Sequence, residues 1–359
     1  MGLNAFNNEQ KLIQQEVRRF AQSELAPIVE EFDKAEKLPV EVFHSLAELG
    51  LMGIILPEEY EGAGLDCTTL CIAAEELSKV WASIGLVMVV NNCLIGYPLL
   101  KYGTEEQRST YLKKLTKSVF GGYGLGSNIS LPEVGFEVDK DGGRYCLSGE
   151  HKFVLNGAEA ELFLFPVQKK KLLLFSKGSG IELKHQYILG MHGAGIVRAK
   201  FDRVEVPEKD CIDIDDTLFE LAHIGFSAIG LGIAQAALES AVKYSKERKQ
   251  FGRSICEFPM VQELLVDMKA RVETSRLLVY ESAQRFDNGE DTSSLSRITR
   301  LYVGETAVLC GLNAIQVYGG YGYTKDYPVE RYLRDAKTLQ VLDTSPILLK
   351  GEIAKELLK

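Results

Sequence analysis

Apolar residues recur every three or four positions through the first third of the chain, from Asn8 to about Lys117. This spacing puts apolar side chains on one face of a helix, and Asn8 is a suitable N-terminal cap. Turn-forming residues divide the region into several helices, at Leu38-Pro39, Pro57-Glu58 and Gly62-Ala63-Gly64. We therefore expect an N-terminal helical domain over residues 1–120.

The periodicity changes between Gly121 and about Pro207. Short stretches there alternate apolar and polar residues or run apolar, and glycine or Asn-Gly separates them. This pattern is typical of strands joined by hairpins, with one turn expected at Asn156-Gly157. The basic run Lys169-Lys170-Lys171 is expected to be a solvated turn. We expect a small β domain over residues 121–210, inserted between helical halves.

Long helical patterns return from Thr217 to the end of the chain. Four runs show them, over residues 217–250, 260–287, 295–320 and 346–359. Four long helices joined by short breaks predict an antiparallel bundle over residues 211–359. The predicted fold class is α+β: an N-terminal helical domain, a middle β domain and a C-terminal four-helix bundle.

Composition narrows the class of protein. The chain has 359 residues, of which 46% are hydrophobic, enough for several packed layers. A net charge of -9 with no block of consecutive basic residues argues against a nucleic-acid surface. Seven cysteines without a CxxC pair indicate reduced thiols, with neither a disulfide frame nor a zinc or other metal site.

The apolar stretches of the chain bear on where in the cell the protein is found. The N-terminus lacks the basic and apolar regions of a signal peptide. The most apolar long stretch, Ile224–Ala237, is too short to span a bilayer. A soluble, cytoplasmic protein without membrane insertion is therefore expected.

Two motifs in the C-terminal half allow more than one interpretation. Arg248 and Lys249 end a long helix, where cations usually offset the helix macrodipole; a fixed arginine there can also hold a pyrophosphate. The stretch Tyr318–Tyr323 interleaves glycine with tyrosine after a helix. It is either a glycine-capped helix with an ordinary loop or a place where backbone approaches a ligand.

One acid, Asp343, stands in the segment "LQVLDTSPILLKG" near the end of the chain. Thr344, Ser345 and Pro346 follow it, and such residues favour the start of a helix. Asp343 is therefore either a helix cap or a catalytic carboxylate, and the local sequence allows both.

The motifs taken together resemble the acyl-CoA dehydrogenase family. In the helical parts the likeness rests on "LGLMGIILPEEYEGAGLD", "YGTEEQRSTYLKKL", "ERKQFG" with "VQELLVDM", and "QVYGGYGYTKDYPVERYLRDAK". In the β domain it rests on "SGEHKFVLNGAEAELFLF" and "FDRVEVPEKDCI". These motifs stand in the family's order over nearly the whole chain, and the family has the three-part architecture predicted above.

The resemblance implies an FAD cofactor between the β domain and the bundle, with its adenine end completed by a neighbouring subunit. A homodimer or homotetramer follows from such a shared site. The family pattern implies cofactor contacts by Tyr123, Leu125, Gly126, Ser127, Phe153, Val154, Leu155, Arg248, Gln250, Phe251, Phe258, Gln316, Val317, Tyr318, Gly319, Gly320 and Ser345.

The resemblance also implies a mechanism. A carboxylate removes the α-proton of an acyl thioester while hydride passes from the β-carbon to the flavin. Asp343 falls where most members keep a glutamate base, so its arm is one methylene shorter. The base position of other members falls at Ala222. Next to it, His223 replaces an arginine and is a second acid–base candidate or a satisfied helix histidine.

The β domain departs from the family pattern near the flavin. "YGLGSNISLPEVG" replaces the Thr-Glu-Pro…Gly-Ser-Asp loop, and Phe153-Val154-Leu155 replaces Trp-Ile-Thr, which keeps an aromatic wall and loses a hydroxyl. The predicted function is FAD-dependent oxidation of an acyl thioester, carried on coenzyme A or on an acyl carrier protein. An electron-transferring flavoprotein or another acceptor would take the electrons.

Two rival functions stay open at this point. One is a catalytically weak or inactive FAD-binding subunit that stabilises an active partner, because three ligand-facing positions have lost their usual Glu, Thr and Arg. The other is a flavin-binding fold reused for a different oxidation.

Overall fold

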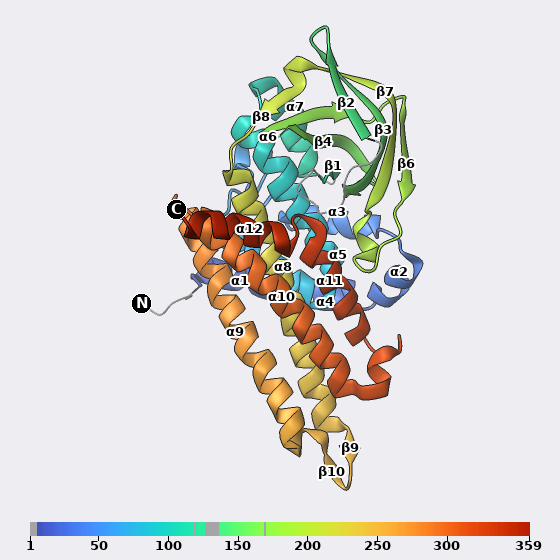
Figure 1. The fold of residues 1–359 in the computed structure, drawn as a ribbon, viewed down its shortest axis with the longest axis vertical. Coiled ribbons are helices and arrows are strands. Elements are labelled where there is room, and N and C mark those ends of the chain that lie inside the picture. The colour runs from blue at the N-terminus through green and yellow to red at the C-terminus, as the bar shows by residue number, and fades with distance from the viewer. Residues whose placement is uncertain (1–5, 118–119, 126–135, 169) are drawn as a thin grey trace.

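The computed structural model describes residues 6–117, 120–125, 136–168 and 170–359. Its helices and strands form an elongated molecule with the sheet at one end and a long helical bundle at the other (Figure 1). The N-terminal helices lie beside the junction of the two. The predicted three-part architecture is confirmed.

The N-terminal part consists of short helices, as predicted. They are α1 (Asn8–Phe20), α2 (Val29–Ala35), α3 (Val40–Glu48), α4 (Cys67–Val80), α5 (Ala82–Val89), α6 (Tyr97–Tyr102) and α7 (Glu105–Leu115), with π-helical stretches at Ala21–Leu25 and Val90–Gly96. The cap of α1 is Asn7 and not Asn8. The Asn7 side chain accepts from the Gln10 backbone N–H at 2.8 Å, and the Gln10 side chain accepts from the Asn7 backbone N–H at 3.1 Å. Because this capping box needs a glutamine three residues after the cap, Gln10 makes Asn7 the cap and not Asn8.

The β domain is one mixed sheet. Its strands are β1 (Phe120–Gly124), β2 (Phe136–Asp141), β3 (Arg144–Leu155), β4 (Ala160–Gln168), β5 (Lys171–Ser176), β6 (Ile181–His185), β7 (Val197–Pro207) and β8 (Cys211–Asp213). The strand order is β6-β7-β3-β1-β4-β5-β8, and β2 pairs with β3.

The connection at Asn156-Gly157 is not the hairpin that the sequence suggested. Strand β1 lies between β3 and β4, antiparallel to the first and parallel to the second. Asn156 has a φ of 55° and its Nδ2 donates to the Val87 carbonyl at 3.0 Å. The Asn-Gly pair therefore turns the chain and fixes the sheet to α5, while a strand from outside the turn fills the gap.

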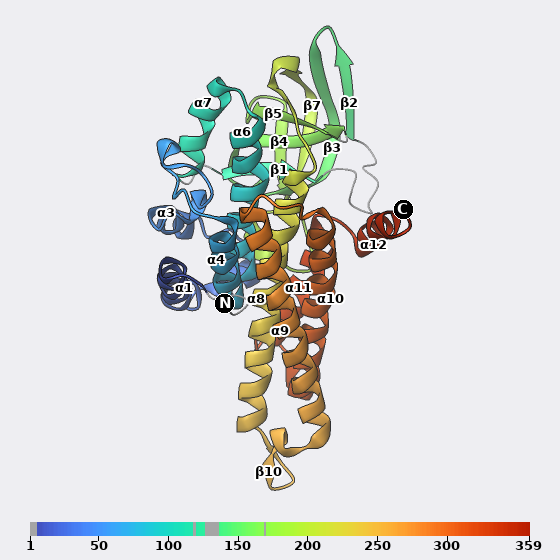
Figure 2. The same ribbon diagram turned by 90° about the vertical axis from the view of Figure 1, so that its left-hand side faces the viewer.

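The bundle contains α8 (Thr217–Glu247), α9 (Pro259–Asp287), α10 (Ser293–Tyr318) and α11 (Val329–Leu342) (Figure 2). The fourth member is thus α11, whereas the sequence assigned that place to the run from Pro346. That run forms α12 (Pro346–Leu357), which packs on α10 and buries only Leu349. Residues such as Ala336, Leu339 and Leu342 give α11 its buried face, and the glycine-rich stretch before it obscured the pattern.

Two helical stretches, Ala82–Tyr102 and Thr217–Glu247, are long and apolar enough to cross a membrane. The most apolar windows of these stretches are 89% and 94% buried inside the fold. They are therefore core helices of this structure.

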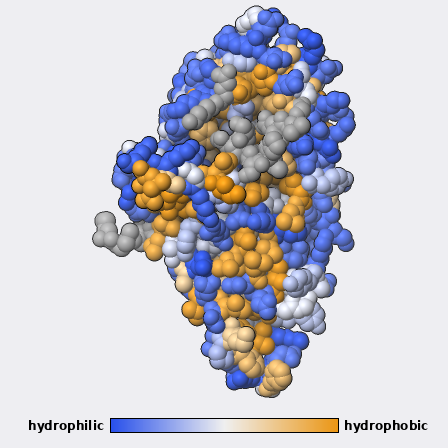
Figure 3. Space-filling view, in the orientation of Figure 1, coloured by the Kyte–Doolittle hydropathy of each residue, from blue (hydrophilic) through white to orange (hydrophobic). Residues whose placement is uncertain are grey.

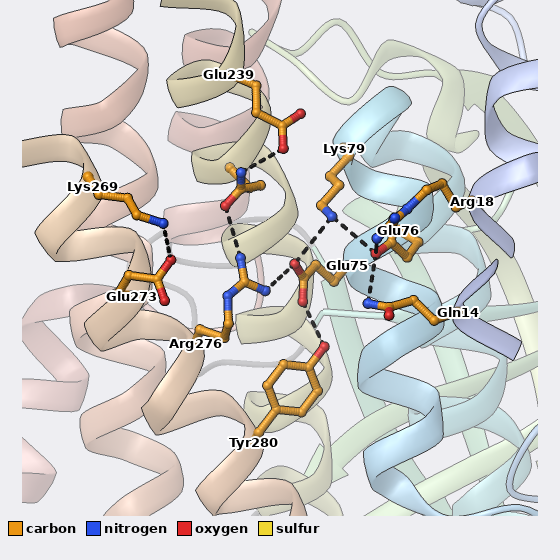
Figure 4. A network of polar contacts seen from close by, with 11 residues as sticks. Gln14, Arg18, Glu75, Glu76, Lys79, Glu239, Lys269, Glu273, Arg276 and Tyr280 are labelled. Atoms are coloured by element: carbon orange, nitrogen blue, oxygen red, sulfur yellow. Dashed lines mark hydrogen bonds and ion pairs between the residues drawn. The ribbon is translucent and has the colours of Figure 1, made fainter. Parts of the chain in front are cut away.

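A polar network joins the N-terminal helices to the bundle (Figure 4). Glu75 and Glu76 lie side by side on α4, and each side chain is 1% exposed. Glu76 accepts from Arg18 Nε and Nη2 at 3.0 and 2.9 Å. Glu75 accepts from Tyr280 at 2.6 Å and from Arg276, both on α9. These buried charges are thus paired across α1, α4 and α9.

Candidate active site

Asp343 follows the last residue of α11, two positions before the cap of α12. That cap is Ser345, whose Oγ accepts from the Leu348 backbone N–H at 3.3 Å. Of the two interpretations that the sequence allowed, the N-terminal cap of the last helix is therefore wrong for Asp343, which is instead the C-cap residue of α11. Its side chain is 9% exposed and turns to a different partner.

That partner is Arg300 on α10. Arg300 Nε lies 3.0 and 3.1 Å from the two carboxylate oxygens of Asp343, and Nη2 lies 2.5 Å from Oδ1. Nη2 also donates to the Leu339 carbonyl at 2.5 Å, and the guanidinium stands 5.7 Å from the centre of the Phe226 ring. The Arg300 side chain is 1% exposed. Such a buried pair is held tightly because neither charge can turn to water.

Arg300 was missed by the sequence reasoning. The only signal in the sequence was that an arginine stands within the long helical run of residues 295–320. An arginine on the core-facing side of such a helix needs a buried anion as its partner. One turn further on, Gly304 leaves room for it. A Cβ at Gly304 would lie 3.0 Å from Arg300 Nη1.

His223 completes the cluster from α8. Its Nε2 lies 4.0 Å from Asp343 Oδ2, beyond hydrogen-bond distance, and its Nδ1 has no partner among the described residues. Burial lowers the pKa of His223 to about 4; Asp343 opposes this shift, and Arg300 and Arg297 add to it. The ring is therefore neutral at pH 7. The structure thus brings both predicted acid–base residues together.

Helix α11 is fixed by its other contacts. Asp335 Oδ1 accepts from the Met191 backbone N–H at 2.6 Å, and Thr338 Oγ1 accepts from the Gly190 N–H at 2.9 Å. Arg334 Nη2 donates to Asp33 of α2 at 2.7 Å. The helix that ends at Asp343 is thereby anchored to the loop after β6 and to the N-terminal helices.

The predicted flavin contacts of the β domain lie on β1 and β3. Tyr123 pairs with Leu155, and the Leu125 N–H donates to the Phe153 carbonyl at 3.0 Å. Tyr123, Leu125, Val154 and Leu155 are buried, and Phe153 is half-buried. The structure thus brings these five together, while Gly126 and Ser127 lie outside the described residues.

A second cluster of predicted cofactor residues lies at the far end of the bundle. A cavity of about 510 Å³ there is lined by Tyr244, Arg248, Gln250, Ile255, Val317, Tyr318, Gly319, Gly320, Tyr321 and Thr324. The Arg248 guanidinium stands 5.6 Å from the centre of the Tyr321 ring, and Tyr244 stacks on Tyr318 at 3.9 Å. A cation beside aromatic faces suits the phosphates and purine of a dinucleotide. Among the predicted residues near this cavity, Gln316 is exposed and Phe258 is half-buried.

A hairpin closes this end of the bundle. Strands β9 (Lys249–Gln250) and β10 (Arg253–Ser254) are joined by Phe251 and Gly252, with φ values of 51° and 81°. Two positive φ angles define a type I′ turn, in which a phenylalanine is strained. Phe251 is nevertheless held there with 93% of its surface exposed.

The acid–base cluster and the cavity beside Arg248 are far apart on one chain. Helix α8 separates His223 from Arg248 by about 37 Å, because a helix rises ~1.5 Å per residue. Figure 2 shows the hairpin at the opposite end of the bundle from the sheet. Among the described residues, no group of three or more His, Cys, Asp or Glu side chains is placed to hold a metal ion.

Comparison with known proteins identifies the family. Residues 7–118 match the acyl-CoA dehydrogenase N-terminal domain, and residues 213–358 match the C-terminal domain. The chain is 34% identical to an acyl-CoA dehydrogenase of Bacillus subtilis, over 98% of each chain.

Two solved structures are also similar. One was determined in work on the electron transferring flavoprotein of Acidaminococcus fermentans; it has a TM-score of 0.91 and 32% identity, and all of both chains is covered. The other is the prolyl acyl carrier protein oxidase AnaB, with a TM-score of 0.88 and 26% identity over 98% of this chain and 100% of that one. These matches confirm the predicted family, reaction class and cofactor. The chain belongs to the acyl-CoA dehydrogenase family and is an FAD-dependent oxidoreductase that acts on the CH–CH group of an acyl thioester.

Proposed function

We propose that the chain desaturates an acyl thioester between Cα and Cβ, with Asp343 and His223 as its acid–base pair. The supporting observation is that these two residues, from α8 and the end of α11, lie 4.0 Å apart with side chains 9% and 10% exposed. A dry site suits proton removal from carbon, because water would otherwise solvate and weaken the base. Bound FAD supplies the acceptor for the β-hydride.

Arg300 defines what Asp343 can do in this reaction. It holds the carboxylate through three contacts of 2.5 to 3.1 Å, so the shorter arm of an aspartate is fixed in one position. His223 stands beside that carboxylate, and no described residue bonds to its Nδ1. The loss of reach relative to a glutamate is therefore accompanied by a second group that can exchange protons.

We also propose that FAD binds between two copies of the chain. His223 and the predicted cofactor residue Arg248 lie about 37 Å apart along α8 on one chain, at ~1.5 Å per residue of helix. The cavity beside Arg248 and the outward-held Phe251 suit a site completed by another subunit. Apolar residues also gather on the exposed face of the bundle (Figure 3). A homodimer, or a homotetramer built from two dimers, follows.

The acyl carrier, the electron acceptor and the location are further parts of the proposal. The similarity to a prolyl acyl carrier protein oxidase supports an acyl group bound to a carrier protein as well as to coenzyme A. The similarity to a structure from electron-transferring flavoprotein work supports such a flavoprotein as acceptor. Burial of both long apolar helices supports an enzyme that is not inserted in a membrane, and we propose that it is cytoplasmic.

The visible spectrum of the purified protein tests the function. We expect a yellow flavin band that bleaches when the protein is mixed with a saturated acyl thioester. A panel of coenzyme A and carrier-protein thioesters then identifies the carrier. A flavin band that no thioester bleaches would favour the FAD-binding subunit without activity, and a purified protein that takes up no FAD would contradict both functions.

A further inference from the structure

We propose that, within the acid–base pair, the α-proton passes to Nδ1 of His223, that Asp343 orients the imidazole, and that Arg300 is the positioning residue that anchors Asp343. This assignment rests on the proposed function and divides its chemistry among three residues. It differs from the family pattern implied by the sequence, in which the carboxylate itself takes the proton.

The carboxylate of Asp343 is already occupied. Oδ1 accepts two N–H groups of Arg300, at 3.0 and 2.5 Å, and Oδ2 accepts Nε at 3.1 Å. Arg300 stays charged at any working pH. A proton on Asp343 would leave this guanidinium, 1% exposed, as a buried cation without its anion, which is strongly unfavourable. Asp343 is therefore better suited to remain an anion through the reaction.

His223 has the unused acceptor. Its Nδ1 is buried and has no hydrogen-bond partner among the described residues, whereas Nε2 faces Oδ2 of Asp343 at 4.0 Å. A shift of about 1 Å turns that approach into a charge-assisted hydrogen bond. The bond places the proton on Nε2, so that the lone pair of the neutral ring lies on Nδ1.

The proton and electron changes balance without another reactant. The Cα–H bond breaks, its proton forms a bond to Nδ1, and its electron pair stays with Cα. That pair becomes the Cα=Cβ bond as hydride leaves Cβ for bound FAD, the oxidant of this family. The resulting imidazolium lies beside the Asp343 anion, which stabilises it.

The charges around His223 make the assignment measurable. Asp343, at the end of α11, raises the pKa of His223, and Arg300 and Arg297, on α10, lower it. Removal of the Asp343 charge should therefore lower this pKa further, and removal of the Arg300 charge should raise it. The ring titration follows these charges whatever His223 does, whereas the pH profile of flavin reduction follows them only if His223 takes the proton.

The experiment measures flavin reduction by an acyl thioester over a range of pH in the FAD-loaded protein. We expect His223→Gln to slow reduction roughly a thousandfold. Asp343→Asn should slow it about a hundredfold through loss of orientation, and should lower the pKa of the rate profile. Arg300→Gln should raise that pKa, while Arg300→Lys, which keeps the charge, should leave it close to the wild-type value. The ring titration of His223, followed by NMR in the same variants without substrate, should shift in the same directions.

Matched controls keep the outcome interpretable. His185→Gln removes an exposed histidine paired with Glu36, and should leave both rate and profile unchanged. If Arg300→Gln does not fold, the pKa of the rate profile in Arg300→Lys and in Asp343→Asn still tests the assignment. The assignment is contradicted if Asp343→Asn abolishes reduction while His223→Gln reacts like the wild type. A wild-type protein that no thioester reduces would instead contradict the proposed function.

Discussion

Two of the buried carboxylate–arginine pairs of the protein differ in how completely their polar atoms are paired. On α4, Glu75 receives Arg276 and Tyr280, so both of its oxygens are occupied (Figure 4). At the end of α11, Arg300 occupies Asp343, but Nε2 of the neighbouring His223 lies 4.0 Å away, and its Nδ1 has no hydrogen-bond partner in the part of the chain that the structure describes. A buried ion pair alone therefore does not indicate a catalytic site, and the role proposed for Asp343 rests on the basic nitrogen of His223 beside it.

The largest effect is expected on the stability of the fold, when the network of Glu75, Arg276 and Tyr280 is broken. Arg276→Met leaves Glu75, 1% exposed, without its arginine, and should lower the free energy of unfolding by about 3–5 kcal/mol. Denaturant unfolding measures the loss. Lys269→Met breaks an ion pair with Glu273 between half-exposed side chains, and should cost less than about 1 kcal/mol. Equal losses of unfolding free energy in the two variants would contradict a stabilising role of the network.

Replacing each buried pair by apolar residues should separate its effect on the stability of the fold from its effect on the rate of flavin reduction. Glu75→Leu with Arg276→Met and Tyr280→Phe removes the charges on α4 and α9 together with the hydroxyl that Glu75 accepts. Asp343→Leu with Arg300→Met does the same at the candidate site. Both sets should regain most of the stability lost by single substitutions, because no buried charge is left unpaired.

The two sets should differ in the rate of flavin reduction. The network set should react like the wild type, and the Asp343 set should react about a hundredfold more slowly, equivalent to about 2.7 kcal/mol. Stopped-flow absorbance measures both. A fast Asp343 set would show that the ion pair serves stability alone.

The dependence of stability on pH should come partly from His223. Its pKa in the folded protein is about 4, below the ordinary 6.5, so the unfolded chain binds the proton first as pH falls. This contribution is intact above pH 6.5 and is lost towards pH 4, by about 2 kcal/mol at pH 5.

The measurement is the unfolding free energy of the wild type minus that of His223→Gln at each pH. The difference is needed because burial raises the pKa of Asp335 to about 6, which acts in the opposite direction over part of this range. His185→Gln serves as the exposed control. A difference that stays constant from pH 7 to 5 would contradict burial of a neutral ring.

The smallest effect is expected from one methyl group at Gly304. Its Cβ would lie 3.0 Å from Arg300 Nη1, so the guanidinium must shift by a few tenths of an ångström. In Gly304→Ala, the higher helix propensity of alanine adds ~1 kcal/mol to stability, which should offset most of the steric cost. Flavin reduction should nevertheless slow several-fold, because the guanidinium that holds Asp343 has moved. Gly351→Ala, on α12 with open space around the new methyl, should leave the rate unchanged. Equal rates in both variants would show that Arg300 need not be held in place.

Much of the fold could be predicted because its signals are local. The change from helical to strand periodicity near Gly121, and back near Thr217, is visible in the sequence. Local signals failed where partners come from a distance. The place of β1 between β3 and β4 is set by long-range pairing, and the buried face of α11 was hidden behind the glycine-rich stretch before it.

The candidate site divides in the same way. Asp343 and His223 were found because their positions relative to the family motifs mark them. Arg300 was missed because its partner lies 43 positions along the chain, and a side-chain rotamer decides whether it faces that partner or solvent. The sequence also could not choose between Asp343 and Ser345 as the cap of α12, since both residue types cap helices well.

The most direct test of the acid–base pair combines Asp343→Asn with His223→Gln in one protein. The wild type and this variant, both loaded with FAD, are mixed with the same acyl thioester, and the loss of flavin absorbance is followed. The account predicts that the variant keeps its flavin band and is reduced at least about ten thousandfold more slowly. Reduction of the variant at the wild-type rate would place the base elsewhere and contradict the account.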